Sequence, residues 1–130
     1  MTSCSSVGTV QSGDIIRFPD IVTIYGISDN TKHSFIKTGK FSCEKAGLYL
    51  VTVSVMSLSP NACFNIKKDG QLLRSVQVTP HSNSINNYHT GTGSVVVMLD
   101  AGENVYSKAI QATKIHHENG YSCMTITKIN

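Results

Sequence analysis

Alternation of apolar and polar side chains is the dominant pattern along the chain. It is most regular in residues 48–57, LYLVTVSVMS. Because successive side chains of a strand point to opposite faces, this alternation predicts a strand with one buried face. The residues of the predicted buried face are Tyr49, Val51, Val53 and Val55, and the other face carries Leu50, Thr52, Ser54 and Met56.

Two stretches predict hairpins. In residues 63–78 the alternation passes from Phe64 and Ile66 to Asp69-Gly70, a dipeptide that suits the positive φ angles of a tight turn. On the far side it continues through Leu73, Val76 and Val78. Residues 94–110 predict a second hairpin, turned at Asp100 to Asn104.

Weaker strand signals stand near both ends of the chain. Residues 15–18 and 22–27 flank Pro19, which suits a bend or a sheet edge, and residues 121–129 alternate as a last strand. No window of helical length carries apolar residues at i, i+3, i+4 and i+7, and turn signals recur about every ten residues. The pattern predicts an all-β, two-sheet sandwich or jelly roll, a single domain over residues 14–130. Residues 1–13, rich in Ser, Thr and Gly, are predicted to be a flexible N-terminal arm.

Composition narrows the classes of partner. The formal charge of +3 is small, Trp is absent and basic residues are scattered, so no nucleic-acid partner is expected. No apolar run approaches the ~20 residues of a membrane helix, and no signal peptide is visible. The protein is either cytosolic or a mature secreted domain whose leader lies outside this sequence. Four cysteines without a CxxC pair favour the secreted, extracellular interpretation.

Catalytic motifs are not found in the sequence. Ser, Cys, His and Asp are present, but none stands in a nucleophile elbow, a cysteine-protease box or a P-loop, so an enzyme is not expected. The pair His116-His117 followed by Glu118 lacks the i, i+4 histidine spacing of a helical zinc site. It is interpreted as a solvated loop before the last strand.

Four stretches in order carry a resemblance to a known family. They are IRF at residues 16–18, TGKFSCEKAGLYLVTVSV at 38–55, KKDGQLL at 67–73 and GTGSVVVMLDAGENVY at 91–106. Together they resemble the complement C1q-like globular domain of the C1q and tumour necrosis factor superfamily, over residues 16–130. The chain lacks a collagen-like stalk, so it is most similar to the short, stalkless C1q-like proteins that are abundant in invertebrates. The last strand departs from the family pattern, because Cys123 stands where a second Gly is usual.

The resemblance implies a jelly roll that assembles as a homotrimer. Strand-borne apolar residues beyond the needs of a thin core would then pack around a three-fold axis. The alternative is that all of them belong to the core of one subunit. These residues are Leu50, Met56, Val97, Leu99 and Tyr106.

Disulfide pairing is also implied by the resemblance. Cys43 and Cys63 occupy the positions of an intrachain bridge found in several family members. Cys4 and Cys123 have no such family pairing. They lie on terminal strands that run side by side in a jelly roll, so Cys4 is expected to pair with Cys123, to bridge two subunits or to stay free.

The function implied by the resemblance is extracellular recognition by a lectin-like innate-immune protein that binds microbial glycans. A cytokine-like receptor ligand and an ion-binding matrix or biomineral-associated protein are the alternatives. Sugars are bound by neutral polar side chains and by aromatic faces. The candidate ligand-binding residues are Asn83, Asn86, Asn87, Tyr88 and Tyr121.

The loop TPHSNSINNYHTGTGS, residues 79–94, is the candidate metal site. In calcium-binding family members the corresponding loop supplies acidic ligands, whereas here the acidic positions are filled by His81 and His89. Calcium prefers carboxylate oxygens, so calcium binding is not expected and no cofactor is predicted. Imidazole suits zinc, copper or nickel, so three copies of either histidine around a three-fold axis would form a weak transition-metal site. The alternative is a solvated loop that binds no metal.

Overall fold

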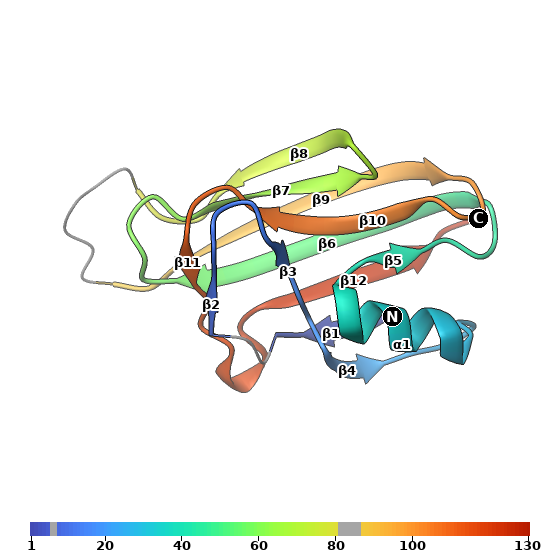
Figure 1. Cartoon of the computed structure of the whole chain (residues 1–130), viewed down its shortest axis with the longest axis horizontal. Helices are drawn as coiled ribbons and strands as arrows, with labels where there is room; N and C mark the ends of the chain where they lie inside the picture. Colours follow the sequence, from blue (N-terminus) through green and yellow to red (C-terminus); the bar gives the residue numbers. More distant parts are fainter. Residues whose placement is uncertain (6–7, 81–86) are drawn as a thin grey trace.

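The chain folds into two antiparallel sheets that lie face to face (Figure 1). A computed structural model describes residues 1–5, 8–80 and 87–130. The first sheet has the order β4-β1-β12-β6-β9. Its strands are β4 (Asp20–Thr23), β1 (Thr2–Cys4), β12 (Cys123–Lys128), β6 (Gly47–Ser57) and β9 (His89–Leu99).

The second sheet has the order β3-β10-β7-β8, and β5 also pairs with β10. Its strands are β3 (Ile15–Ile16), β10 (Asn104–Ala109), β7 (Cys63–Lys68), β8 (Gln71–Gln77) and β5 (Phe41–Ser42). A two-stranded ribbon of β2 (Thr9–Val10) and β11 (Thr113–Lys114) closes one end of the sandwich (Figure 1). This arrangement confirms the predicted two-sheet jelly roll.

The core lies between the two sheets and follows the predicted alternation. The inward side chains of β6 are all buried, and they meet the inward residues Phe64 and Ile66 of β7. The hairpin between β7 and β8 turns at Asp69, whose φ is 49°, as the sequence predicted. Strand β6 pairs with both β12 and β9, so it forms the centre of the first sheet's core-facing surface.

A helix, α1 (Asp29–Thr38), was not predicted and lies beside β5 (Figure 1). Its apolar pattern is weak, because Phe35 is the one large side chain that it buries completely. Capping residues define it instead. The Ser28 hydroxyl accepts a hydrogen bond from the Thr31 N–H, and Gly39 ends the helix at φ 80°. None of the helices in the described ranges is long and apolar enough to cross a membrane.

The predicted second hairpin is wrong, because β9 and β10 belong to different sheets. The turn that joins them is held from outside: the Gly102 N–H donates to the Cys43 carbonyl, and the Cys43 N–H donates to the Glu103 carbonyl. After the turn the chain pairs with β5 and β7, and β9 stays on β6. Alternation along each strand was the same for either connection, so the sequence pattern could not separate them.

The N-terminal residues do not form the flexible arm that composition predicted. Residues 2–4 are strand β1, which pairs with β12 on one side and β4 on the other. The Ser3 side chain is buried and its hydroxyl donates to the Phe18 carbonyl. Short polar residues occupy this strand because it lies between two partners, and its backbone groups are paired with both.

The disulfide pairing differs from the family expectation. Cys4 and Cys123 are directly opposite each other on β1 and β12 and form a disulfide within the chain. Cys43 and Cys63 are free, so the predicted bridge between them is wrong. Cys43 is bonded to Glu103 before β10 begins, and Cys63 to Ile110 after β10 ends. The length of β10 separates the two thiols by roughly 20 Å, and a disulfide needs Cα atoms within about 7 Å.

Two glycines set the spacing of the sheets at the β8–β9 edge. A Cβ atom at Gly91 would lie 3.0 Å from the Val78 Cγ2 atom, and one at Gly93 would lie 2.4 Å from the Val76 Cγ2 atom. Both valines are buried and belong to the core. The edge of one sheet therefore rests directly on the backbone of the other.

Thiol counting tests the pairing. Denatured, unreduced protein is expected to show two reactive thiols, Cys43 and Cys63, and four after reduction. The double variant Cys4→Ser/Cys123→Ser removes a bridge between residues 119 apart, and should lose roughly 4–5 kcal/mol of unfolding free energy in the chain-entropy model. Chemical denaturation measures this loss, with Cys63→Ser as the control that keeps the bridge. Four thiols without reductant would contradict the assignment.

Gly93→Ala tests the close approach of the sheets. The added methyl meets the stiff, β-branched Val76, so the unfolding free energy is expected to fall by about 1–3 kcal/mol in urea denaturation. Gly70→Ala is the matched control, since no atom lies within 4 Å of a Cβ built there. Equal stability of Gly93→Ala and the parent chain would show that the edge can open freely.

Candidate functional site

Three aromatic rings form a cluster at the end of the sandwich where the chain enters β9. The His116 ring lies between two tyrosines, with its centroid 4.6 Å from that of Tyr88 and 5.1 Å from that of Tyr121. Both tyrosines remain open to solvent, with 52% and 45% of their surface exposed. The sequence named the two tyrosines separately as ligand candidates, and the structure brings them together through a histidine that had been interpreted as part of a bland loop.

Backbone pairing fixes the position of the histidine. Its N–H donates to the Met56 carbonyl at 2.8 Å, near the end of β6. The preceding residue, Ile115, forms an isolated bridge with Ser57 and is fully buried. Tyr121 follows η1 (Glu118–Gly120), a short 3-10 turn that carries the chain from His116 back toward β12. The cluster is therefore anchored on the last residues of the central strand.

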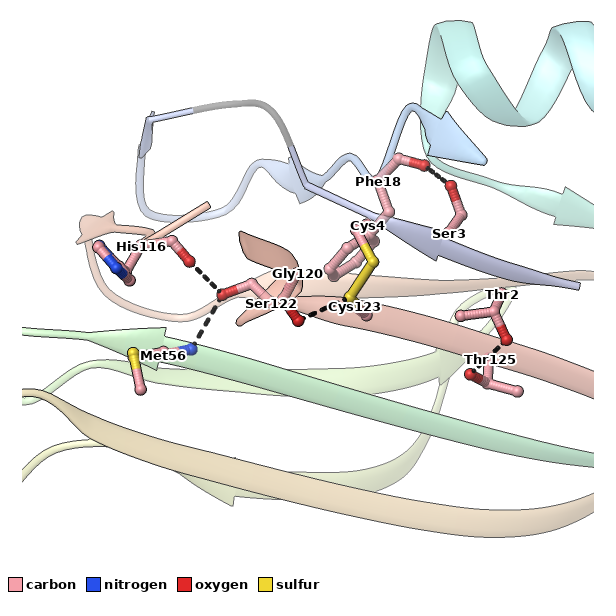
Figure 2. Close-up of a disulfide and its surroundings, with 10 residues drawn as sticks. All are labelled: Thr2, Ser3, Cys4, Phe18, Met56, His116, Gly120, Ser122, Cys123 and Thr125. Carbon is pink, nitrogen blue, oxygen red and sulfur yellow. Dashed lines mark hydrogen bonds between the residues drawn. A yellow bond between two sulfur atoms is a disulfide. The ribbon is translucent and has the colours of Figure 1, made fainter. Parts of the chain in front are cut away.

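Figure 2 shows a second anchor, the buried hydroxyl of Ser122, between His116 and Met56. This hydroxyl donates to the His116 carbonyl at 2.8 Å and accepts from the Met56 N–H at 3.0 Å. The next residue is Cys123, whose bond to Cys4 ties β12 to β1 (Figure 2). The disulfide and the serine together hold the segment that carries Tyr121, which limits its movement relative to β6.

A cleft of about 480 Å³ opens beside the cluster. Tyr88 and His116 line it, and Lys114, His117 and Glu118 place charges of both signs around it. A second cleft, of about 350 Å³, includes Tyr25, Glu44 and Lys128 in its lining. The first cleft is the stronger binding candidate, because it combines a pair of exposed aromatic faces with a rigid backbone.

Hydrogen bonds to hydroxyls shift one carboxyl at the second cleft. The Ser28 side chain donates to the Glu44 carboxylate and lowers the pKa of that carboxyl, since the bond favours the charged form. The bond also connects the N-cap of α1 to the loop before β6. This is a structural role, and it leaves the first cleft as the candidate for recognition.

The remaining predicted site residues divide into two groups. Asn87 is exposed and immediately precedes Tyr88, so it belongs to the same end of the molecule. His81, Asn83 and Asn86 lie outside the described residues. His89 is exposed at the start of β9. No group of three His, Cys, Asp or Glu residues that could hold a metal occurs within the described ranges. The transition-metal hypothesis, which needs three copies of the chain, stays a prediction.

The outer face of the first sheet is a second candidate surface. Val96 and Met98 of β9 are 59% and 52% exposed, and they lie opposite the outward residues Leu50 and Leu48 of β6. Beyond this apolar patch the face carries paired hydroxyls, with Thr52 bonded to Ser94 and Ser54 to Thr92 at 2.8 Å each. The outward positions of β6 and β9 carry no charge.

The structure corrects the predicted set of surplus apolar residues. Val97 and Leu99 point into the core, and Tyr106 is buried on the second sheet. Leu50 and Met56 are half-buried on the outer face of the first sheet, as an interface would require. Sequence alternation identified the right strand but assigned the wrong face of β9, because the three consecutive valines 95–97 fit either register.

Comparisons with known proteins agree on the family. The family model of the C1q domain matches residues 3–126. The B-type polypeptide of the human complement C1q subcomponent is 32% identical over 94 residues, which are 72% of this chain and 34% of that protein. The chain thus corresponds to about a third of the length of this curated relative.

Solved structures with the same fold come from both halves of the superfamily. The globular domain of zebrafish complement 1qA has a TM-score of 0.79 at 19% identity, covering 99% of this chain and 95% of that one. Eiger TNF from S. frugiperda has a TM-score of 0.73 at 14% identity, with coverage of 99% and 90%. Murine APRIL has a TM-score of 0.74 at 13% identity, with coverage of 98% and 97%. The jelly-roll topology and the match over nearly the whole chain show that this protein belongs to the C1q domain family.

Proposed function

We propose that this protein is a secreted, lectin-like recognition protein that binds microbial glycans through the cleft beside Tyr88, His116 and Tyr121. The observation that carries the proposal is the pair of exposed tyrosines fixed on either side of one histidine. An aromatic ring exposed to water without a structural partner leaves an apolar face that a sugar can cover. The Cys4–Cys123 disulfide supports an oxidising, extracellular location.

The chemistry of the cleft suits a carbohydrate. Apolar faces of sugar rings stack on aromatic side chains, and sugar hydroxyls exchange hydrogen bonds with amide, imidazole and charged groups. Asn87, His117 and Glu118 are exposed groups of this kind at the same end of the molecule. No chemical step is assigned to these groups, since recognition requires only that they hold a ligand.

A homotrimer is the second part of the proposal. Val96 and Met98 form an exposed apolar patch with the half-buried Leu48 and Leu50, and the neighbouring strand positions are uncharged. Burying such a face between copies removes apolar surface from water without burying an unpaired charge. Three sites on one rigid body would raise avidity for repeated surface glycans without any new contact.

The sequence-based alternatives, a cytokine-like ligand and an ion-binding matrix protein, stay predictions. The likeness to Eiger TNF and to APRIL is at 14% and 13% identity, which shows a shared fold and carries no receptor-binding residue to this chain. The aromatic cleft favours the glycan proposal over both.

Removal of both exposed rings tests the glycan site. The double variant Tyr88→Ala/Tyr121→Ala is expected to weaken binding about tenfold or more, because each stacked ring contributes about 1 kcal/mol. A glycan array with the parent protein first identifies the strongest ligand, and calorimetry with that glycan then measures the affinity. Tyr25→Ala, which removes a tyrosine that is 93% exposed at the other cleft, should bind as the parent does. Unchanged affinity of the folded double variant would remove the cleft as the sugar site.

Light scattering tests the trimer. At micromolar concentration the parent protein should have three times the mass of the 14.1 kDa chain. Met98→Glu should yield monomers, because a carboxylate buried in the apolar patch has no partner. Leu72→Glu, at an exposed leucine of β8 on the other sheet, is the control and should remain trimeric. A monomeric parent protein would overturn this part of the proposal and leave the sugar site to be judged by the tyrosine variants.

A further inference from the structure

The outer face of the second sheet gathers basic side chains around one tyrosine. Tyr106 of β10 is flanked by Val105 and Ser107, which point into the core, so its own side chain lies on the outer face. It is nevertheless buried, because other side chains cover its ring. The Lys40 Nζ atom lies 5.2 Å from the ring centroid, within the range of a cation–π contact.

Two short strands bring Lys40 and Arg17 to the same side of Tyr106. Strand β5 pairs Phe41 with Val105, and β3 pairs Ile16 with Ser107, so both strands end opposite Tyr106. The next residue on β5's side is Lys40 and the next on β3's side is Arg17. A Cβ atom built at Gly39 would lie 3.2 Å from the Arg17 Cγ atom, which confirms that these two chain segments touch.

The other side of the tyrosine is also basic. Lys67 of β7 is directly opposite Tyr106 in the register, and Lys108 follows two residues later on β10, on the same face. Neighbouring strands lie about 4.8 Å apart and same-face residues of one strand about 7 Å apart. Lys40, Lys67, Lys108 and Arg17 therefore form a basic patch, named here by these residues, with spacings of roughly 5–10 Å.

Carboxylates do not neutralise the basic patch. The ion pair of the described residues joins Lys68 to Glu103 at 3.5 Å, outside this group. Asp69 stands at the hairpin end of the face, where its carboxylate accepts from the Asn104 amide and its carbonyl from the Tyr106 hydroxyl. Like charges within a Debye length, about 8 Å at physiological salt, repel one another. The four cations thus carry a repulsion that a bound polyanion would relieve.

We infer that the basic patch binds a linear sulfated polysaccharide. Lysine and arginine side chains on a flat, open strand face match a chain that repeats its oxyanions at short intervals. Nucleic acid fits less well, since Tyr106 is covered and offers no free ring for a base to stack on. A membrane fits less well too, since Leu72 is the one large apolar side chain on this sheet that is strongly exposed in the described structure. The patch is on the opposite sheet from the proposed trimer face, so assembly would leave it open.

Affinity chromatography and calorimetry with dextran sulfate test the inference, and unsulfated dextran is the ligand control. The trimeric or monomeric parent protein should bind dextran sulfate in a salt-sensitive manner and should not bind dextran. Lys67→Ser/Lys108→Ser should weaken the affinity about tenfold, whereas Lys67→Arg/Lys108→Arg should retain it because the charge is kept. Thermal unfolding verifies that each variant is folded.

A second lysine pair separates the patch from net charge. Lys45→Ser/Lys128→Ser removes the same two charges from exposed positions by the 350 Å³ cleft, and should bind dextran sulfate within twofold of the parent. Equal losses in both serine pairs would overturn the patch, as would an absence of binding by the parent protein. Tighter binding of a DNA oligonucleotide or of anionic phospholipid vesicles than of dextran sulfate would overturn the polysaccharide assignment. Tyr88→Ala/Tyr121→Ala should leave dextran sulfate binding unchanged, so failure here is distinct from failure of the glycan cleft.

Discussion

Burial of one face of β6 is the interaction on which the rest of the structure depends. Its inward residues lie at the centre of the core, and its edges pair with β12 and β9 along most of the strand. Because strand side chains alternate, burying Tyr49 and Val51 obliges Leu48 and Leu50 to face outward. The same register that forms the core therefore creates the apolar outer patch, and a slip of one residue would exchange the two.

The end of β6 also determines where recognition is proposed. Met56 holds His116 through its carbonyl and Ser122 through its N–H, so the aromatic cluster is attached to the most strongly paired strand. The adjacent disulfide joins β12 to β1 and closes the sheet near the chain's two ends (Figure 2). A binding surface built in this way loses little conformational entropy when a ligand binds, because its backbone is already ordered.

The two sheets differ in the chemistry of their outer faces. The first sheet carries hydroxyls and apolar side chains, which suit contact with another copy of the chain. The second carries Lys67, Lys108 and their basic neighbours around Tyr106, which suit an anionic partner. A sandwich has two such faces and buries neither, so one small domain can present an assembly surface, an anion-binding face and a cleft at its end without conflict.

Periodicity by itself determined the all-β class, the buried face of β6 and the Asp69 turn, because these depend on side-chain alternation and local backbone preference. It also placed Tyr88 and Tyr121 among the candidates as exposed aromatics. Only the tertiary structure decided that β9 crosses to a different sheet from β10, that Cys4 meets Cys123 while Cys43 and Cys63 stay apart, and that His116 joins the two tyrosines. Each of these depends on which distant strands pair, and pairing is fixed by the packing of the whole core, to which a local pattern of apolar residues is blind.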